Sequence, residues 1–283
     1  MPIFRRLLMR EVIAMWPIAL TGLGVTAVLA VLTWLVSLSR TDVSLVDRMW
    51  PILIAGAGCV YFVLMPAPGI RSVCMIAIAV AWALRLSLFI TVRNWGHGED
   101  RRYQEIRARN QPNFGFKSLY LIFALQVVLA WIVSAPLFVG VVAGNTVGVV
   151  APNPLGLLDW AGMSIAIFGV VFEAIGDQQM ATFKSDPAHK GQVMDRGLWR
   201  YTRHPNYFGE ACVWWGLWLM ALSAAGWGGA WSVVSPLLMT VLLLKVSGVT
   251  LLEKDIAERR PKYREYVERT NAFVPGPPRK GTP

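Results

Sequence analysis

The sequence predicts an all-α, polytopic membrane protein with about seven transmembrane helices, forming a single membrane-embedded domain over residues 1–283. Of the 283 residues, 55% are hydrophobic and 16% are charged, and the mean hydropathy is +0.49. Soluble domains average about 45–50% apolar and about 25% charged residues. Several stretches without ionised side chains are also long enough to cross a bilayer. These observations exclude a disordered chain, a disulfide scaffold and a typical water-soluble enzyme.

The expected spans follow one another along the chain, and turn-forming residues separate them. The stretch 118–158 is too long for one crossing, so we expect a loop after residue 143 that contains Gly144, Asn145 and three further turn residues. The stretch 211–244 is also too long, and its glycine-rich segment 226–229 predicts a hairpin. The spans cover residues 12–39, 49–70, 72–92, 118–143, 155–175 and the two arms of 211–244.

Basic residues are concentrated in three segments between or after the spans. Segment 93–117 carries six Lys or Arg residues, 176–205 carries five and 245–283 carries nine, whereas 144–154 carries none. The positive-inside rule places such segments in the cytoplasm, together with the C-terminus. Three arginines near the N-terminus oppose this orientation, but they are outnumbered. Because the basic residues lie in short loops, the net charge of +10 does not indicate a nucleic-acid partner.

Ionisable side chains at membrane depth cost about 2.5–3.5 kcal/mol each on insertion scales, so each is a candidate functional residue. Glu173 and Asp177 are four residues apart and share a helix face. Glu210 and Lys245 each lie sixteen residues from the glycine turn, which places them at one level of a hairpin, either as a structural ion pair or as the floor of a polar pocket. The full set is Arg85, Glu173, Asp177, Glu210, Lys245 and Glu253.

The segment 195–210 has the highest density of polar and aromatic side chains. Its His204-Pro205 step predicts that a helix begins at Pro205, with open backbone N–H groups at its start. A helix start beside several guanidinium groups favours phosphate binding, although a basic loop in contact with anionic lipid headgroups is the alternative. The guanidinium groups in question belong to Arg196, Arg200 and Arg203, and Asn206 lies one turn before Glu210.

Several site chemistries are excluded by the sequence. Three histidines are too few for a histidine-rich metal centre, so we expect no metal site. No strand-associated G-x-G-x-x-G, P-loop or G-x-S-x-G motif occurs. The three cysteines lack a C-x-x-C spacing, which is typical of small buried side chains. A dinucleotide would therefore bind without a Rossmann fold.

Residues 155–278 resemble the C-terminal domain of steroid 5α-reductases and sterol reductases, chiefly through the motif Arg-His-Pro-Asn-Tyr-Phe-Gly-Glu at 203–210. A related bacterial family of uncharacterised membrane proteins is similar over most of the chain, including Arg85 and the turn at 96–103. The resemblance implies a steroid-reductase-like bundle in a bacterial inner membrane. It also implies NADPH in a cytoplasm-facing cavity and reduction of a carbon–carbon double bond.

The resemblance further implies roles for individual residues. It makes 1–117 the substrate side, with a cavity lined by the first three spans, and 118–283 the cofactor-binding part. The substrate would be a sterol-, isoprenoid- or fatty-acyl-like molecule from the bilayer. No catalytic residue is identified, and Glu173, Tyr207 and Arg85 are the candidates. The implied cofactor contacts are Asp177, Lys184, Arg196, Arg200, Tyr201, Arg203, His204, Asn206, Tyr207, Glu210 and Lys245.

Two features depart from that pattern and leave other functions open. The Gln-Glu pair that holds a steroid ketone is absent, and Trp82 replaces an active-site tyrosine. Isoprenylcysteine carboxyl methyltransferases, which bind S-adenosylmethionine, share the Arg-His-Pro-x-Tyr element. A methyltransferase is therefore the alternative to the reductase, and a transporter or lipid-binding scaffold is the third hypothesis.

Overall fold

A computed structural model describes residues 2–143, 154–246 and 262–279. The chain divides into two compact units, each assembled from two separate segments. Unit 1 comprises Met1–Asp159 and Met220–Val234, and unit 2 comprises Trp160–Leu219 and Ser235–Pro283. In unit 1, span four packs with the first three spans and the 226–233 turn joins them. The expected division of roles after residue 117 stays a prediction.

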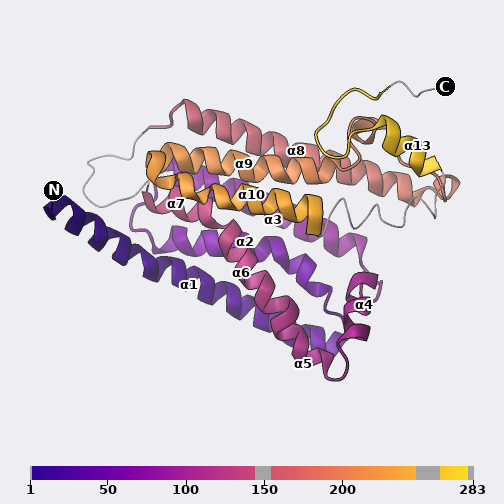
Figure 1. Cartoon of the computed structure of the whole chain (residues 1–283), viewed down its shortest axis with the longest axis horizontal. Coiled ribbons are helices and arrows are strands. Elements are labelled where there is room, and N and C mark those ends of the chain that lie inside the picture. Colours follow the sequence, from indigo (N-terminus) through magenta and orange to yellow (C-terminus); the bar gives the residue numbers. More distant parts are fainter. Residues whose placement is uncertain (1, 144–153, 247–261, 280–283) are drawn as a thin grey trace. The chain divides into compact units, whose positions relative to one another are not determined.

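Unit 1 is a helical bundle in which α2 is central. This helix packs against α1, α3, α6 and α7. Figure 1 shows α4 and α5 at the end of this unit where α1 finishes. Its elements are α1 Pro2–Arg40, α2 Leu45–Leu64, α3 Ile70–Arg93, α4 Arg101–Arg109, α5 Phe114–Ser118, the π-helix η1 Leu119–Ala124, α6 Leu125–Val133, α7 Ala135–Ala143 and the 3-10 helix η4 Gly226–Val233.

Unit 2 is built on two long helices that lie side by side, α8 and α9 (Figure 1). As expected, α9 begins at Pro205, whose fixed φ suits the first helical position. The elements are α8 Leu157–Ser185, the 3-10 helices η2 Pro187–His189 and η3 Gly197–Arg200, α9 Pro205–Ala225, α10 Val234–Val241, the π-helix η5 Leu242–Val246 and α13 Lys262–Arg269.

The predicted fold class is confirmed over the described residues. Six helices are long and apolar enough to cross a membrane, and the last of them covers Pro205–Lys245. That stretch folds back on itself, because Trp215 Nε1 donates a hydrogen bond of 3.3 Å to Thr240 Oγ1. A straight helix would place these residues about 38 Å apart. The glycine turn therefore separates two arms, which brings the number of crossings to the expected seven.

One expected boundary is wrong. The fifth span does not end near Ile175: α8 continues to Ser185, so Asp177 and Lys184 are helical residues. The helix stops only before Asp186-Pro187, where the proline disfavours helical geometry at the preceding residue. The third span is confirmed as one continuous helix, α3, from Ile70 to Arg93, with Arg85 within it. The expected loop residues 144–153 lie outside the described residues.

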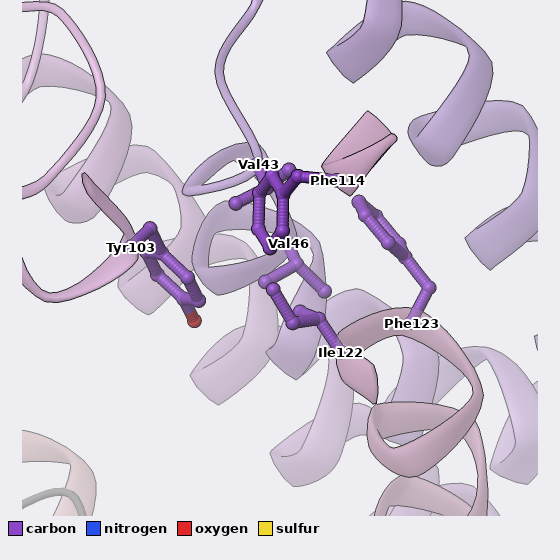
Figure 2. Packing of buried hydrophobic residues seen from close by; sticks show 6 residues of the cluster. All are labelled: Val43, Val46, Tyr103, Phe114, Ile122 and Phe123. Carbon is purple, nitrogen blue, oxygen red and sulfur yellow. The ribbon is translucent and has the colours of Figure 1, made fainter. Parts of the chain in front are cut away.

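The segment that follows α3 ties α4 to the start of α2. Asp47 accepts hydrogen bonds from Arg102 Nη2 at 2.9 Å and from the Tyr103 hydroxyl at 2.6 Å. Glu99 accepts two bonds of 2.7 Å from Arg107 and one of 2.9 Å from the Val43 N–H. Beneath these pairs lies a buried apolar cluster of Val43, Val46, Tyr103, Phe114, Ile122 and Phe123 (Figure 2). The charges of this loop therefore serve largely to hold unit 1 together.

A further ion pair in unit 1 is buried. Arg71, in the first turn of α3, makes a two-pronged contact with Asp159 through bonds of 2.6 Å and 2.8 Å. Asp159 also accepts from Ser223 Oγ at 2.7 Å and from the Gly156 N–H at 2.9 Å. Both charged side chains are buried. Four donated hydrogen bonds offset the desolvation of the carboxylate, which alone would cost several kcal/mol.

Asp159→Asn is expected to destabilise the protein by about 3–5 kcal/mol, because it leaves the buried Arg71 guanidinium without its counter-charge. Thermal unfolding of detergent-purified protein measures the effect. Glu105→Gln is the matched control: it breaks the exposed Arg101–Glu105 pair and should cost less than about 1 kcal/mol. Equal shifts in the two variants would contradict a structural role for Asp159.

The Glu99 carboxylate should make stability depend on acid pH. Burial raises its pKa, but the hydrogen bonds from Arg107 and Val43 outweigh burial and hold the pKa below the ordinary 4.5. A lowered folded-state pKa stabilises the protein above about pH 4.5, and this stabilisation is lost as the pH falls through the folded value. The melting-temperature difference between wild type and Glu99→Gln should therefore shrink between about pH 5 and about pH 3. A difference that stays constant over this range would rule out the linkage.

Candidate functional site

In unit 2, α8 and α9 run antiparallel with their backbones in close contact. A Cβ added to Gly216 would lie 2.4 Å from the carbonyl oxygen of Gly162, and one added to Gly209 would lie 2.7 Å from that of Gly169. At the start of α9, a Cβ on Gly176 would lie 3.1 Å from Pro205. Only glycine permits this approach, which is typical of membrane helices that associate through small residues.

The close approach brings four of the predicted site residues to the same stretch of the two helices. Gly209 lies against the backbone of Glu173, which places Glu210 in the next position. Gly176 lies against the backbone of Asn206, and Asp177 follows it. The three carboxylates are buried, with relative exposures of 1% for Glu173, 5% for Asp177 and 7% for Glu210. Buried carboxylates of this kind mark a candidate functional site in membrane-spanning helices.

Asn206 contributes a polar atom that the described structure does not satisfy. Its Oδ1 is buried and has no hydrogen-bond donor among the residues that are described. A buried acceptor without a donor costs about 1–3 kcal/mol. A ligand N–H or O–H would remove this cost.

Just before α9, buried Arg203 and Thr202 join the loop to the C-terminal tail. Arg203 Nη1 donates to the carbonyls of Val267 and Thr270, and the Thr202 hydroxyl donates to that of Phe273 at 2.8 Å. The Arg203 guanidinium therefore orders the tail, and its expected role with phosphate stays a prediction. The neighbouring His204 is buried and stacks on Tyr207, with ring centroids 5.3 Å apart.

A hollow of 370 Å³ lies between the loop before α9 and the tail. Arg200 is the only predicted site residue in it, and the tail arginines were not expected from the sequence. The nine basic residues of 245–283 were a signal, but no spacing links positions so far apart. The lining residues are Asp195, Arg200, Arg269, Thr270, Pro278 and Arg279.

The other predicted site residues are mostly at the surface. Lys184, Arg196, Tyr201 and Lys245 have exposed side chains. The Trp215–Thr240 bond sets a hairpin register in which positions 210 and 245 oppose one another, as the spacing predicts.

Two of the remaining candidates need separate mention. Arg85 is half-buried in unit 1, on α3, and Glu253 lies outside the described residues. Within the described ranges 2–143, 154–246 and 262–279, no group of three or more His, Cys, Asp or Glu is arranged to hold a metal ion.

Unit 1 contains an apolar cavity of 640 Å³, within the range of about 300–1,000 Å³ for small-molecule sites. Its lining comes from α1, α2, α6, α7, the end of α9 and the 226–234 turn, and not from the first three spans alone. In the described structure no lining residue comes from α3, and α6 of span four packs directly on α1 and α2. The Tyr61 hydroxyl, 3.0 Å from Ser134 Oγ, is the one hydroxyl among the lining side chains.

Gly209→Ala is expected to destabilise the protein by about 1–3 kcal/mol, because the new methyl group overlaps backbone atoms of α8 and forces the helices apart. Thermal unfolding in detergent tests this expectation. Gly24→Ala is the control, since a Cβ at that helical position meets nothing within 4 Å. If Gly209→Ala were as stable as Gly24→Ala, the close α8–α9 contact would be refuted.

Comparison with known proteins gives a family but no activity. Residues 33–270 match the family described as a protein of unknown function, DUF1295. An uncharacterized protein of Schizosaccharomyces pombe is 25% identical over 280 residues, covering 90% of this chain and 78% of the yeast protein. No solved structure matches the chain. Because the family match spans well over half of its residues, the chain belongs to the DUF1295 family.

Proposed function

We propose that this protein is an integral membrane oxidoreductase that uses NADPH to reduce a carbon–carbon double bond of a lipophilic substrate. The observation that carries the proposal is the buried Asn206 Oδ1, which lacks a donor among the described residues and lies on helices that also bury three carboxylates. The resemblance of the 203–210 motif to steroid and sterol reductases supports the same reaction class.

The donors and acceptors of unit 2 fit the nicotinamide end of such a cofactor. A carboxamide offers two N–H donors and one carbonyl acceptor, and an asparagine side chain offers the matching set. Glu210 and Asp177 would accept from the ribose hydroxyls or from the same amide. NADPH, when bound, supplies the hydride. The role of the chain is to orient the reacting groups and to exclude water from them.

Basic side chains around the start of α9 would hold the phosphates. Arg200 is exposed and makes no ion pair within the described chain, so its guanidinium is available for a ligand. Lys184 and Arg196 are exposed in the same segment of sequence. Arg203 would act indirectly, because its contacts with the tail carbonyls position the loop that carries Arg200.

The apolar cavity of unit 1 is the proposed site for the substrate. Its mouth includes Trp16 and Trp231, which are about half exposed, with relative exposures of 54% and 55%. A lining with so few polar groups favours a sterol-, isoprenoid- or fatty-acyl-like molecule from the bilayer.

The distribution of basic segments supports a cytoplasmic C-terminus and a cofactor site that opens to the cytoplasm. A bacterial inner membrane is proposed from the resemblance alone. NADPH is available in the cytoplasm, so this orientation and the proposed reaction agree. The Arg-His-Pro-x-Tyr element is shared with S-adenosylmethionine-dependent methyltransferases, and the experiment below distinguishes the two.

Thermal unfolding of the detergent-purified full chain with NADPH, NADH or S-adenosylmethionine tests the proposal. NADPH at a hundredfold excess over its Kd should add about 2.7 kcal/mol of stability. Asn206→Ala should weaken NADPH binding at least about tenfold, because two hydrogen bonds to the ligand are lost. Gln178→Ala is the matched control, since it removes an exposed amide one residue from Asp177 on the same helix.

Three other results of this experiment would each contradict part of the proposal. Selective stabilisation by S-adenosylmethionine would indicate a methyltransferase, and stabilisation by neither class would indicate a transporter or a lipid-binding scaffold. Equal NADPH affinity in Asn206→Ala and Gln178→Ala would mean that the nicotinamide site lies elsewhere.

A further inference from the structure

The hollow beside the C-terminal tail has an excess of positive charge that the described residues do not neutralise. Arg269 pairs with Asp195. The guanidinium groups of Arg200 and Arg279, which line the same hollow, make no ion pair or side-chain hydrogen bond with the described residues. Three arginines and one aspartate give the hollow a net charge of +2. Like charges that converge in one hollow repel one another unless an anion is bound.

Hydrogen bonds between residues that are far apart in the sequence fix the walls of this hollow. The Arg279 N–H donates to the Arg269 carbonyl at 2.8 Å, which closes the tail on α13. The Gly276 N–H donates to the Tyr201 carbonyl at 3.0 Å, and the Tyr266 hydroxyl donates to that of Trp199. These bonds hold both chain segments in place, so Arg200, Arg269 and Arg279 line one hollow.

We propose that this hollow binds a phosphomonoester. Such a group carries a charge of about −1.5 to −2 near neutral pH and three acceptor oxygens, which matches the net charge of +2. Guanidinium forks bind phosphate oxygens in pairs. The Thr270 hydroxyl, which donates to none of the described residues, supplies a further donor at the wall. A phosphodiester or a carboxylate carries one negative charge and would leave about half of the excess uncompensated.

Two kinds of ligand carry a phosphomonoester. One is the phosphate on a nucleotide sugar, and the other is the headgroup of a lipid that ends in a phosphomonoester. The inference deepens the proposed function, because Arg200 is also proposed to hold the phosphates of NADPH. It does not require the reduction, since the charge of the hollow favours a dianion whatever molecule carries it.

Calorimetric titration of the detergent-purified full chain with inorganic phosphate tests the site without any other ligand. The affinity should fall at least about tenfold in the double variant Arg200→Ala/Arg279→Ala. Neither guanidinium has a partner in the described protein, so the double variant should fold. Arg264→Ala is the control: it removes an exposed arginine of α13 that does not line the hollow and should leave the affinity unchanged.

The source of the phosphate is identified by displacement of bound inorganic phosphate. Adenosine 2′,5′-bisphosphate should displace it if the natural ligand is a nucleotide, and short-chain phosphatidic acid should do so if it is a lipid. Displacement by neither would overturn the proposal. An equal loss of affinity in the double variant and in Arg264→Ala would also overturn it, because binding would then follow net charge and not this hollow. Both results are obtained without NADPH, so they are separate from the test of the reductase.

Discussion

The backbone contact between α8 and α9 is the constraint on which the candidate site depends. Gly169 and Gly209 allow two membrane-spanning helices to approach until carbonyl and Cα atoms touch. Lipid offers no hydrophobic gain for helix association, so close packing and hydrogen bonds must supply it. The same approach sets Glu173 beside Glu210 along the helix pair. A larger side chain at either glycine would separate the polar groups as well as the helices.

The two units differ in the kind of polar group that they bury. Unit 1 pairs Arg71 with Asp159, and its cavity is almost entirely apolar. Unit 2 buries three carboxylates, and the Oδ1 of Asn206 has no donor among the described residues. A satisfied ion pair fixes a structure, whereas a buried polar atom such as Asn206 Oδ1 is suited to a ligand. This contrast supports a lipophilic substrate in unit 1 and a polar cofactor in unit 2 as the proposed roles.

The C-terminal tail is part of the candidate site and not an appendage. Arg203 reaches from the start of α9 to the carbonyls of residues 267 and 270, and Thr202 reaches to residue 273. Arg203, which was expected to bind phosphate, thereby also orders the tail, and two tail arginines, Arg269 and Arg279, line one hollow with Arg200. The two tail arginines thereby add their positive charge to that of Arg200 in one hollow.

Composition and local pattern determined the fold class, the position of the hairpin turn and the start of α9 at Pro205, because a bilayer demands long apolar helices and proline and glycine act on their own neighbours. The shared helix face of Glu173 and Asp177 follows from spacing alone. The tertiary structure decided which charged side chains contact other parts of the protein and which of them line a hollow. It paired Arg71 with Asp159, turned Arg203 to the tail and gathered Arg269 with Arg200. Contacts between positions 64 to 88 residues apart depend on helix packing and loop geometry, which no local spacing encodes.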